Sequence, residues 1–165
     1  MRAQPVRALW QPWQAWTQRW PLLVAALWWG AVTAWSFVAV PLLFAHFDNP
    51  AVAGGMAARL FQVQSWVSVA AALALLLWGR AQRGRGQAGD ASWALLPWLL
   101  LGALAGLVQE FGVAQRILTA RQTGANLALW HGLGTLLVAL QWLCALRSLW
   151  WLAGRDRRAS EVGGR

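Results

Sequence analysis

Two ionisable side chains stand inside long apolar stretches of the sequence and could do chemistry there. Glu110 follows "LLLGALAGLVQ", and His131 lies within "ANLALWHGLGTLLVALQWLCAL". A charged group inside a bilayer is costly unless it is paired, hydrated or neutralised, so each residue is a candidate for function. A carboxylate and an imidazole could share a proton, or they could bind a divalent metal ion together.

The elements that position these two residues follow from composition. Of the 165 residues, 59% are hydrophobic and only 12% are charged, which indicates one integral membrane domain and not a soluble protein. A spanning helix needs about 20 mostly apolar residues. The predicted fold is therefore an all-α, integral membrane four-helix bundle over residues 20–152, with spans at about 21–47, 61–79, 93–117 and 125–151. A basic, Trp-rich interfacial segment (1–19) precedes it and a basic tail (153–165) follows.

The distribution of basic residues predicts the orientation of the bundle. All 14 basic residues are arginines, and with 5 acidic residues they give a formal net charge of +9. The arginines concentrate in both tails and between the second and third spans, so both termini should face the cytoplasm of a bacterial inner membrane. This pattern favours anionic lipids at the cytoplasmic face as partners over nucleic acid. A second copy of the chain or another membrane protein is a further expected partner.

Polar residues gather at the opposite, periplasmic end of the predicted spans. Glu110 and His131 should lie at similar depth, roughly 10 Å from that surface at 1.5 Å per residue, so we expect them to pair across the hairpin. Gln62 opens the second span beside Gln64. The expected ligand-binding or polar cluster comprises Glu110, His131, His46, Gln64, Arg116 and Asn126. The alternative is that these groups only hold helices together, with about 1 kcal/mol from each hydrogen bond.

Small residues predict where helices approach closely. Gly102 and Gly106 are four residues apart in the third span, and Gly132 and Gly134 lie in the fourth. Such spacing lets neighbouring backbones come into contact in a membrane. Pro41 lacks a backbone donor and should kink the outer part of the first span.

Three stretches carry a resemblance to a known family. They are "PLLFAHFDNPAVAGGMAARLFQVQSWVS" (Pro41–Ser68), "EFGVAQRI" (Glu110–Ile117) and "LWHGLG" (Leu129–Gly134), and they resemble the bacterial branch of the transmembrane-protein-205-like family, a domain of unknown function. The resemblance implies a four-helix inner-membrane protein and supplies no activity. More distantly, the architecture is similar to small membrane bundles that include copper-resistance proteins and a haem-associated protoporphyrinogen oxidase. The chain has only two histidines and two methionines, and no "CxxCH" motif.

Three functions are open from the sequence. The first is a pocket for a metal ion or small solute, with His131 and Glu110, and His46 as a third donor, as metal ligands. The second, suggested by the distant resemblance, is a haem-linked membrane redox protein with His131 and His46 as axial ligands. The third is a structural or assembly component of a membrane complex. No nucleophile with its base, phosphate-binding loop or nucleotide fold is present in the sequence, so no catalytic residue is assigned and the chain is not classed as an enzyme.

Overall fold

The computed structural model describes residues 11–84, 93–117, 119, 124 and 126–163, and the side chains of 19–84, 93–117, 119, 124 and 126–155. This part of the chain is helical and contains no strand, which confirms the all-α prediction. Its elements are α1 (Gln11–Ala34), the π-helical η2 (Trp35–Ala39), α2 (Val40–His46), α3 (Pro50–Gly84), α4 (Leu96–Val108), the π-helical η4 (Gln109–Ala114) and α6 (Leu127–Gly163).

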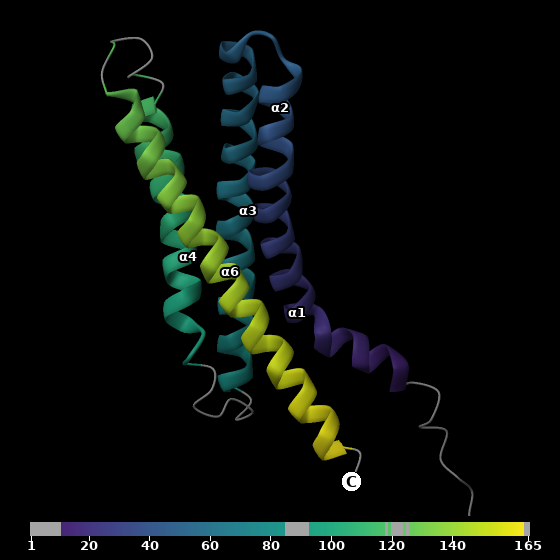
Figure 1. Ribbon diagram of the computed structural model, residues 1–165. Helices are drawn as coiled ribbons and strands as arrows, with labels where there is room; N and C mark the ends of the chain where they lie inside the picture. The colour runs from purple at the N-terminus through teal and green to yellow at the C-terminus, as the bar shows by residue number, and fades with distance from the viewer. Residues whose placement is uncertain (1–10, 85–92, 118, 120–123, 125, 164–165) are drawn as a thin grey trace, which may run out of the picture.

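These elements form four helical rods (Figure 1). The segments α1, η2 and α2 make one rod, α3 the second, α4 and η4 the third, and α6 the fourth. The rods pack in a closed order, α1 on α3, α3 on α4, α4 on α6 and α6 on α1. We call the end where α1 begins and α6 ends the terminal end, and the end with the α2–α3 connection the hairpin end (Figure 1).

Each rod is long and apolar enough to cross a membrane. The four candidate spans are Arg19–His46, Pro50–Gly84, Leu96–Ile117 and Leu127–Arg155. This agrees with the number of spans predicted from composition, and it indicates a multi-pass membrane protein. The predicted interfacial segment is 1–19; residues 1–10 and the side chains of 11–18 lie outside the described part of the chain, and Gln11 already begins α1.

The start of the second rod differs from the prediction. We expected the second span to begin near residue 61, but α3 begins at Pro50. Asn49 caps this earlier start, because its Oδ1 accepts a hydrogen bond of 2.9 Å from the Ala51 N–H. Proline is favoured in the first helical turn, where a backbone donor has no partner to lose, and the alanines that follow favour helix.

The first rod accommodates Pro41 through a change of helical register. Within η2 the Val40 N–H donates to the carbonyl of Trp35, five residues earlier, and α2 then continues to His46. Proline leaves the carbonyl four residues before it without its usual partner, and a π-helical turn is one way in which helices absorb such a defect. The structure therefore has a π-helical turn just before Pro41, and the predicted kink stays a prediction.

Trp28 of α1 lies at the centre of the bundle with no exposed surface. Its Nε1–H donates to Ser68 Oγ of α3 at 2.9 Å. Its ring fills the space beside Gly102 of α4, where an added Cβ would lie 2.7 Å from Trp28 Cη2 and 3.2 Å from Cys144 Cβ of α6. All four rods therefore meet at this indole.

Replacing Gly102 with alanine should disrupt this meeting point. We expect Gly102→Ala to lower the apparent Tm of the detergent-solubilised protein, because the new methyl group overlaps the Trp28 ring, and overpacking costs about 1–3 kcal/mol. The matched control is Gly30→Ala in α1, where an added Cβ meets nothing within 4 Å. That change should hold or raise the Tm, and equal loss of Tm in both variants would contradict the proposed packing.

Candidate functional site

Glu110 lies in η4, and 8% of its surface is exposed. Its Oε1 accepts a hydrogen bond of 2.8 Å from Gln62 Nε2 of α3. This hydrogen bond joins two rods in the hairpin half of the bundle. The carboxyl group is thus held by an amide and faces α3.

Further polar side chains are buried around this contact. Gln64 is 1% exposed, and its Oε1 accepts a long hydrogen bond of 3.4 Å from Ser36 Oγ of η2. Gln109 is also buried, and its Nε2 lies against α6, 3.6 Å from where a Cβ on Gly134 would be. Within the described residues Gln109 Oε1 has no hydrogen-bond partner. This half of the interior therefore holds an acceptor that the described residues do not satisfy.

A further buried polar side chain, Gln141, lies deeper in the bundle on α6. Gln141 has no exposed surface, and neither atom of its amide has a partner within the described residues. It lies seven residues beyond Gly134, which places it roughly 10 Å further toward the terminal end. We define the interior polar set as the buried residues Gln64, Ser65, Ser68, Gln109, Glu110 and Gln141, and the exposed Gln62 contacts this set through Glu110. Gln141 was not among the predicted site residues, although a lone amide inside the apolar run "TLLVALQWLCAL" indicates a polar group in the membrane interior.

His131 does not join Glu110. Its side chain is exposed, whereas Glu110 is buried and bonded to α3. Three residues further along α6, Gly134 lies against Val113 and Gln109 of η4, whereas the His131 side chain is exposed and makes no hydrogen bond or ion pair with Glu110 among the described residues. The expected Glu110–His131 pair was wrong, because two residues at similar depth in neighbouring helices need not point their side chains toward each other.

The other predicted polar residues lie at the hairpin end of the bundle, outside its interior. His46 is exposed, and its Nδ1 is 3.0 Å from the carbonyl oxygen of Leu42. Asn126 caps α6, since its Oδ1 accepts from the Leu129 N–H at 3.0 Å. Arg116 is exposed, and its guanidinium carbon is 5.7 Å from the centre of the Trp130 ring. Of the predicted cluster, only Glu110 and Gln64 are buried in the interior.

The side chains predicted to bind a metal ion or haem do not lie together. Among the residues that the structure describes, no three His, Cys, Asp or Glu side chains lie close enough to hold a metal ion together. Axial ligation of haem by His46 and His131 needs both imidazoles inside the bundle, and both are exposed. The arrangement of these residues therefore does not fit either group.

Of the glycines predicted to pack helices together, some lie against a neighbouring rod and one is exposed. An added Cβ at Gly106 would lie 3.0 Å from the backbone oxygen of Ser65, so α3 and α4 are in close contact there. Gly134 lies against η4. Gly132, by contrast, is exposed and would meet nothing within 4 Å, so the packing role expected for it is wrong. Two residues turn an α-helix by about 200°, which places Gly132 on the far side from Gly134.

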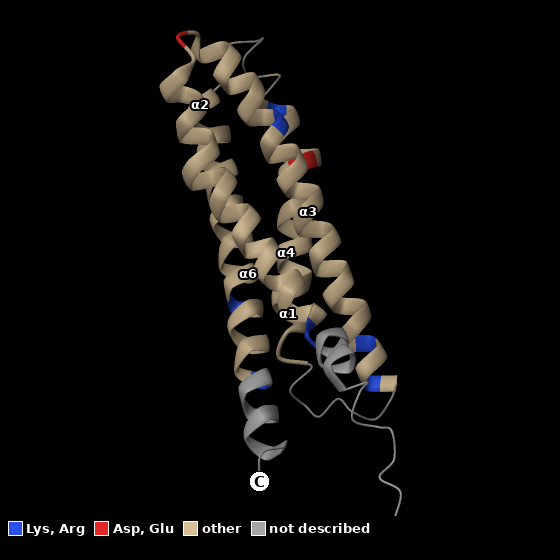
Figure 2. Ribbon diagram, turned by 90° about the vertical axis from the view of Figure 1, so that its right-hand side faces the viewer, with Lys and Arg blue, Asp and Glu red and all other residues tan. Residues whose placement is uncertain are grey.

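Arginine and tryptophan pair at the terminal end. The guanidinium carbon of Arg83 lies 4.6 Å from the Trp93 ring centre, and that of Arg147 lies 6.0 Å from Trp98. Arg155 lies 5.3 Å from Trp78 and 5.8 Å from Trp151. We call these residues the Arg–Trp collar. Figure 2 shows basic residues gathered at this end, whereas both acidic segments coloured red lie in the hairpin half.

The fold and the buried polar interior define an all-helical, multi-pass membrane protein. Residues 23–126 match the model of DUF4149, a domain of unknown function, and because this match covers more than half of the chain, the protein belongs to that family. The matched region contains Gln62, Gln109 and Glu110 and ends before α6. The family is uncharacterised, and the match provides no link to the transmembrane-protein-205-like family. The chain matches no curated protein and no solved structure.

The contact of Glu110 with Gln62 can be tested by a double-mutant cycle. We expect Gln62→Ala and Glu110→Ala to be coupled by about 1 kcal/mol in stability, because each removes the same interhelical hydrogen bond. The control cycle pairs Glu110→Ala with His131→Ala, whose effects should add to within about 0.5 kcal/mol. A larger coupling with His131 than with Gln62 would contradict the observed pairing.

Proposed function

We propose that this protein is a multi-pass protein of the bacterial inner membrane, with both termini in the cytoplasm, that binds a small cation or hydrogen-donating solute at Glu110. The single observation that carries the proposal is the burial of the Glu110 carboxyl group, with one amide donor, in a membrane-spanning rod. An ionisable group in that position is a functional candidate by default.

The orientation is supported by the distribution of described arginines along the bundle. At the terminal end, Arg19 begins the first span and Arg155 ends the fourth. Arg80 and Arg83 lie just before the end of the second span at Gly84, and Arg147 lies in the same half. Arg59 and Arg116 are the described arginines of the hairpin half. Basic residues flank spans on the cytoplasmic side, so the terminal end is the cytoplasmic one in this proposal. The hairpin end, with the interior polar set beneath it, is then periplasmic.

Reporter fusions test this orientation. Green fluorescent protein fused after Arg165 should fluoresce and alkaline phosphatase fused there should be inactive, because the phosphatase matures only in the periplasm. Fusions made after Asn49, in the α2–α3 connection, should give the opposite pair of results. Active phosphatase at Arg165 would overturn the proposed orientation.

The class of solute follows from the chemistry of the available groups. Glu110 offers carboxylate oxygens, and Gln109 Oε1 is a buried acceptor without a partner in the described residues. A buried acceptor left unsatisfied costs about 1–3 kcal/mol, which a bound donor or cation would recover. The site therefore selects positive charge or N–H and O–H groups over anions. Glu110, and not His131, is the centre of the proposed site.

The position of Glu110 in the hairpin half of the bundle supports access of the solute from the periplasmic side. Glu110 lies seven residues before the end of its span at Ile117, or roughly 10 Å from the hairpin surface. Gln62 is itself exposed, so the contact reaches the outside of the bundle at this depth. Below it the interior is closed by Trp28, Leu75 and Leu99, each at most 3% exposed.

Ligand-induced stabilisation tests the solute-binding proposal. We expect at least one of sodium, ammonium, methylammonium and magnesium chloride to raise the apparent Tm of the full chain in detergent. A ligand present at 100 times its Kd stabilises the folded state by about 2.7 kcal/mol. The shift should disappear in Glu110→Gln, which replaces the carboxyl group with an amide and keeps the size of the side chain.

The matched control is Asp48→Asn, which neutralises an exposed carboxyl group at the same end of the bundle. It should retain the full shift in Tm. If none of the four salts stabilises the protein, or if Glu110→Gln responds as the unchanged chain does, the proposed binding site is wrong.

A second candidate function is a structural or assembly role in a membrane complex, and the Arg–Trp collar favours it. Arginine over a tryptophan face at the interface suits anionic lipid headgroups, which the proposed cytoplasmic leaflet supplies. The resemblance to the transmembrane-protein-205-like family stays a prediction that rests on the three sequence stretches quoted above.

A further inference from the structure

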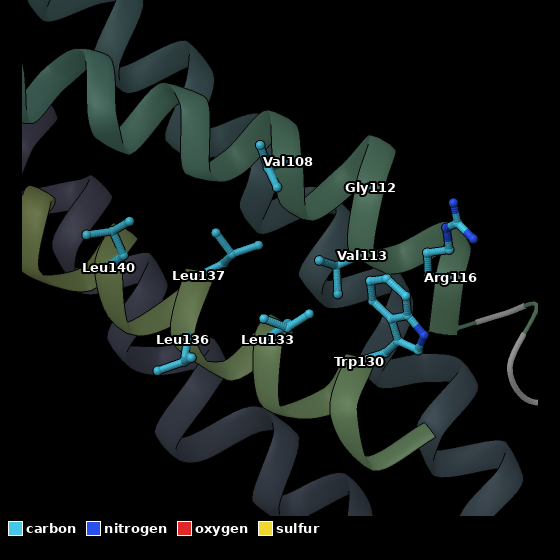
Figure 3. Close-up of a pocket in the computed structure, with 9 residues that line it drawn as sticks. All are labelled: Val108, Gly112, Val113, Arg116, Trp130, Leu133, Leu136, Leu137 and Leu140. Atoms are coloured by element: carbon cyan, nitrogen blue, oxygen red, sulfur yellow. The ribbon is translucent and has the colours of Figure 1, made fainter. Parts of the chain in front are cut away.

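A groove of about 380 Å³ runs along the outside of the bundle between the third rod and α6 (Figure 3). Its walls are apolar: Val108, Gly112 and Val113 line one side, and leucines from Leu133 to Leu140 line the other. Arg116 and Trp130 lie together at one end of the groove (Figure 3). We call this the η4–α6 groove.

The groove exists because the side chains on its walls do not fill the space between the two rods. Gly112 of η4 is exposed, and an added Cβ there would have Val108 Cγ1, at 3.7 Å, as its only neighbour. Leu136 on the opposite wall is 68% exposed. An apolar surface of this kind inside the hydrocarbon region is covered by lipid or by protein.

The polar end of the groove lies at the depth of lipid headgroups. Arg116 is the penultimate residue of the third span, and Trp130 lies in the first turn of α6. The guanidinium group lies over the Trp130 ring at 5.7 Å, and arginine and tryptophan are the side chains that anchor spans at this depth. Within the described residues no acidic side chain pairs with Arg116, and its charge is open to an external anion.

We propose that the η4–α6 groove binds an anionic phospholipid, with one acyl chain along the leucines of α6 and the headgroup phosphate on Arg116. The charge at the mouth and the apolar walls match the two parts of such a lipid. A volume of about 380 Å³ lies near the lower limit of about 300–1,000 Å³ for ligand sites, which suits one hydrocarbon chain better than a packed helix. This site is separate from Glu110, whose carboxyl group faces α3.

Native mass spectrometry of the full chain, released from detergent with added phosphatidylglycerol or phosphatidylcholine, tests the proposal. We expect one phosphatidylglycerol to remain bound in preference to phosphatidylcholine. Arg116→Gln should lower the retention of phosphatidylglycerol about fivefold, the effect expected from one arginine at the membrane surface. Arg59→Gln, which removes another exposed arginine of the hairpin half, should leave retention unchanged.

A second pair of variants tests the acyl-chain part of the groove. Gly112→Phe should fill the groove and reduce retention of both lipids, while Gly55→Phe, at an exposed glycine of α3 with open space around it, should not. Equal retention of the two lipids by the unchanged chain, or equal losses in Arg116→Gln and Arg59→Gln, would overturn the proposal. A dimer that Gly112→Phe dissociates would identify a second copy as the occupant and would also overturn it.

Discussion

The contact between Trp28 and Gly102 is the constraint on which the rest of the bundle depends. Lipid tails are as apolar as leucine, so helices in a membrane gain little from hiding apolar surface and must associate through close packing and hydrogen bonds. Trp28 does both, because its ring fills the space at Gly102 and its indole N–H donates to Ser68. The same position brings Cys144 of α6 into contact, so the spacing of all four rods is set at one level.

Two π-helical turns determine what the hairpin half of the bundle can do. Each carries a polar side chain that reaches α3: Ser36 of η2 bonds to Gln64, and Glu110 of η4 is bonded by Gln62. A π-helical turn rotates the side chains beyond it relative to a regular helix, and such turns are frequent at functional sites. The rods are therefore joined by side-chain hydrogen bonds toward the hairpin end, and around Trp28 by close packing together with the Trp28–Ser68 hydrogen bond.

Much of the architecture could be predicted because it depends on local patterns. Four apolar runs and the buried Gly102 and Gly106 follow from composition and from a four-residue spacing. The partner of Glu110 could not be predicted in the same way. Depth along a helix is readable from residue number, but the direction of a side chain depends on helical register, and η4 changes that register at Glu110 itself. Pairing with Gln62 instead of His131 is the consequence.

The arginine and tryptophan side chains at the two ends of the bundle together determine the depth of Glu110 in the proposed membrane orientation. In the proposed orientation, the Arg–Trp collar lies at one membrane interface, and Arg116 with Trp130 lies at the other. Because both anchors are made by side chains on the rods, the depth of Glu110 between them cannot change without moving an arginine out of its interface. The core around Trp28 closes the interior below Glu110. The proposed solute would therefore reach this carboxyl group from the hairpin half, so the proposed access and the proposed anchoring depend on the same arrangement of helices.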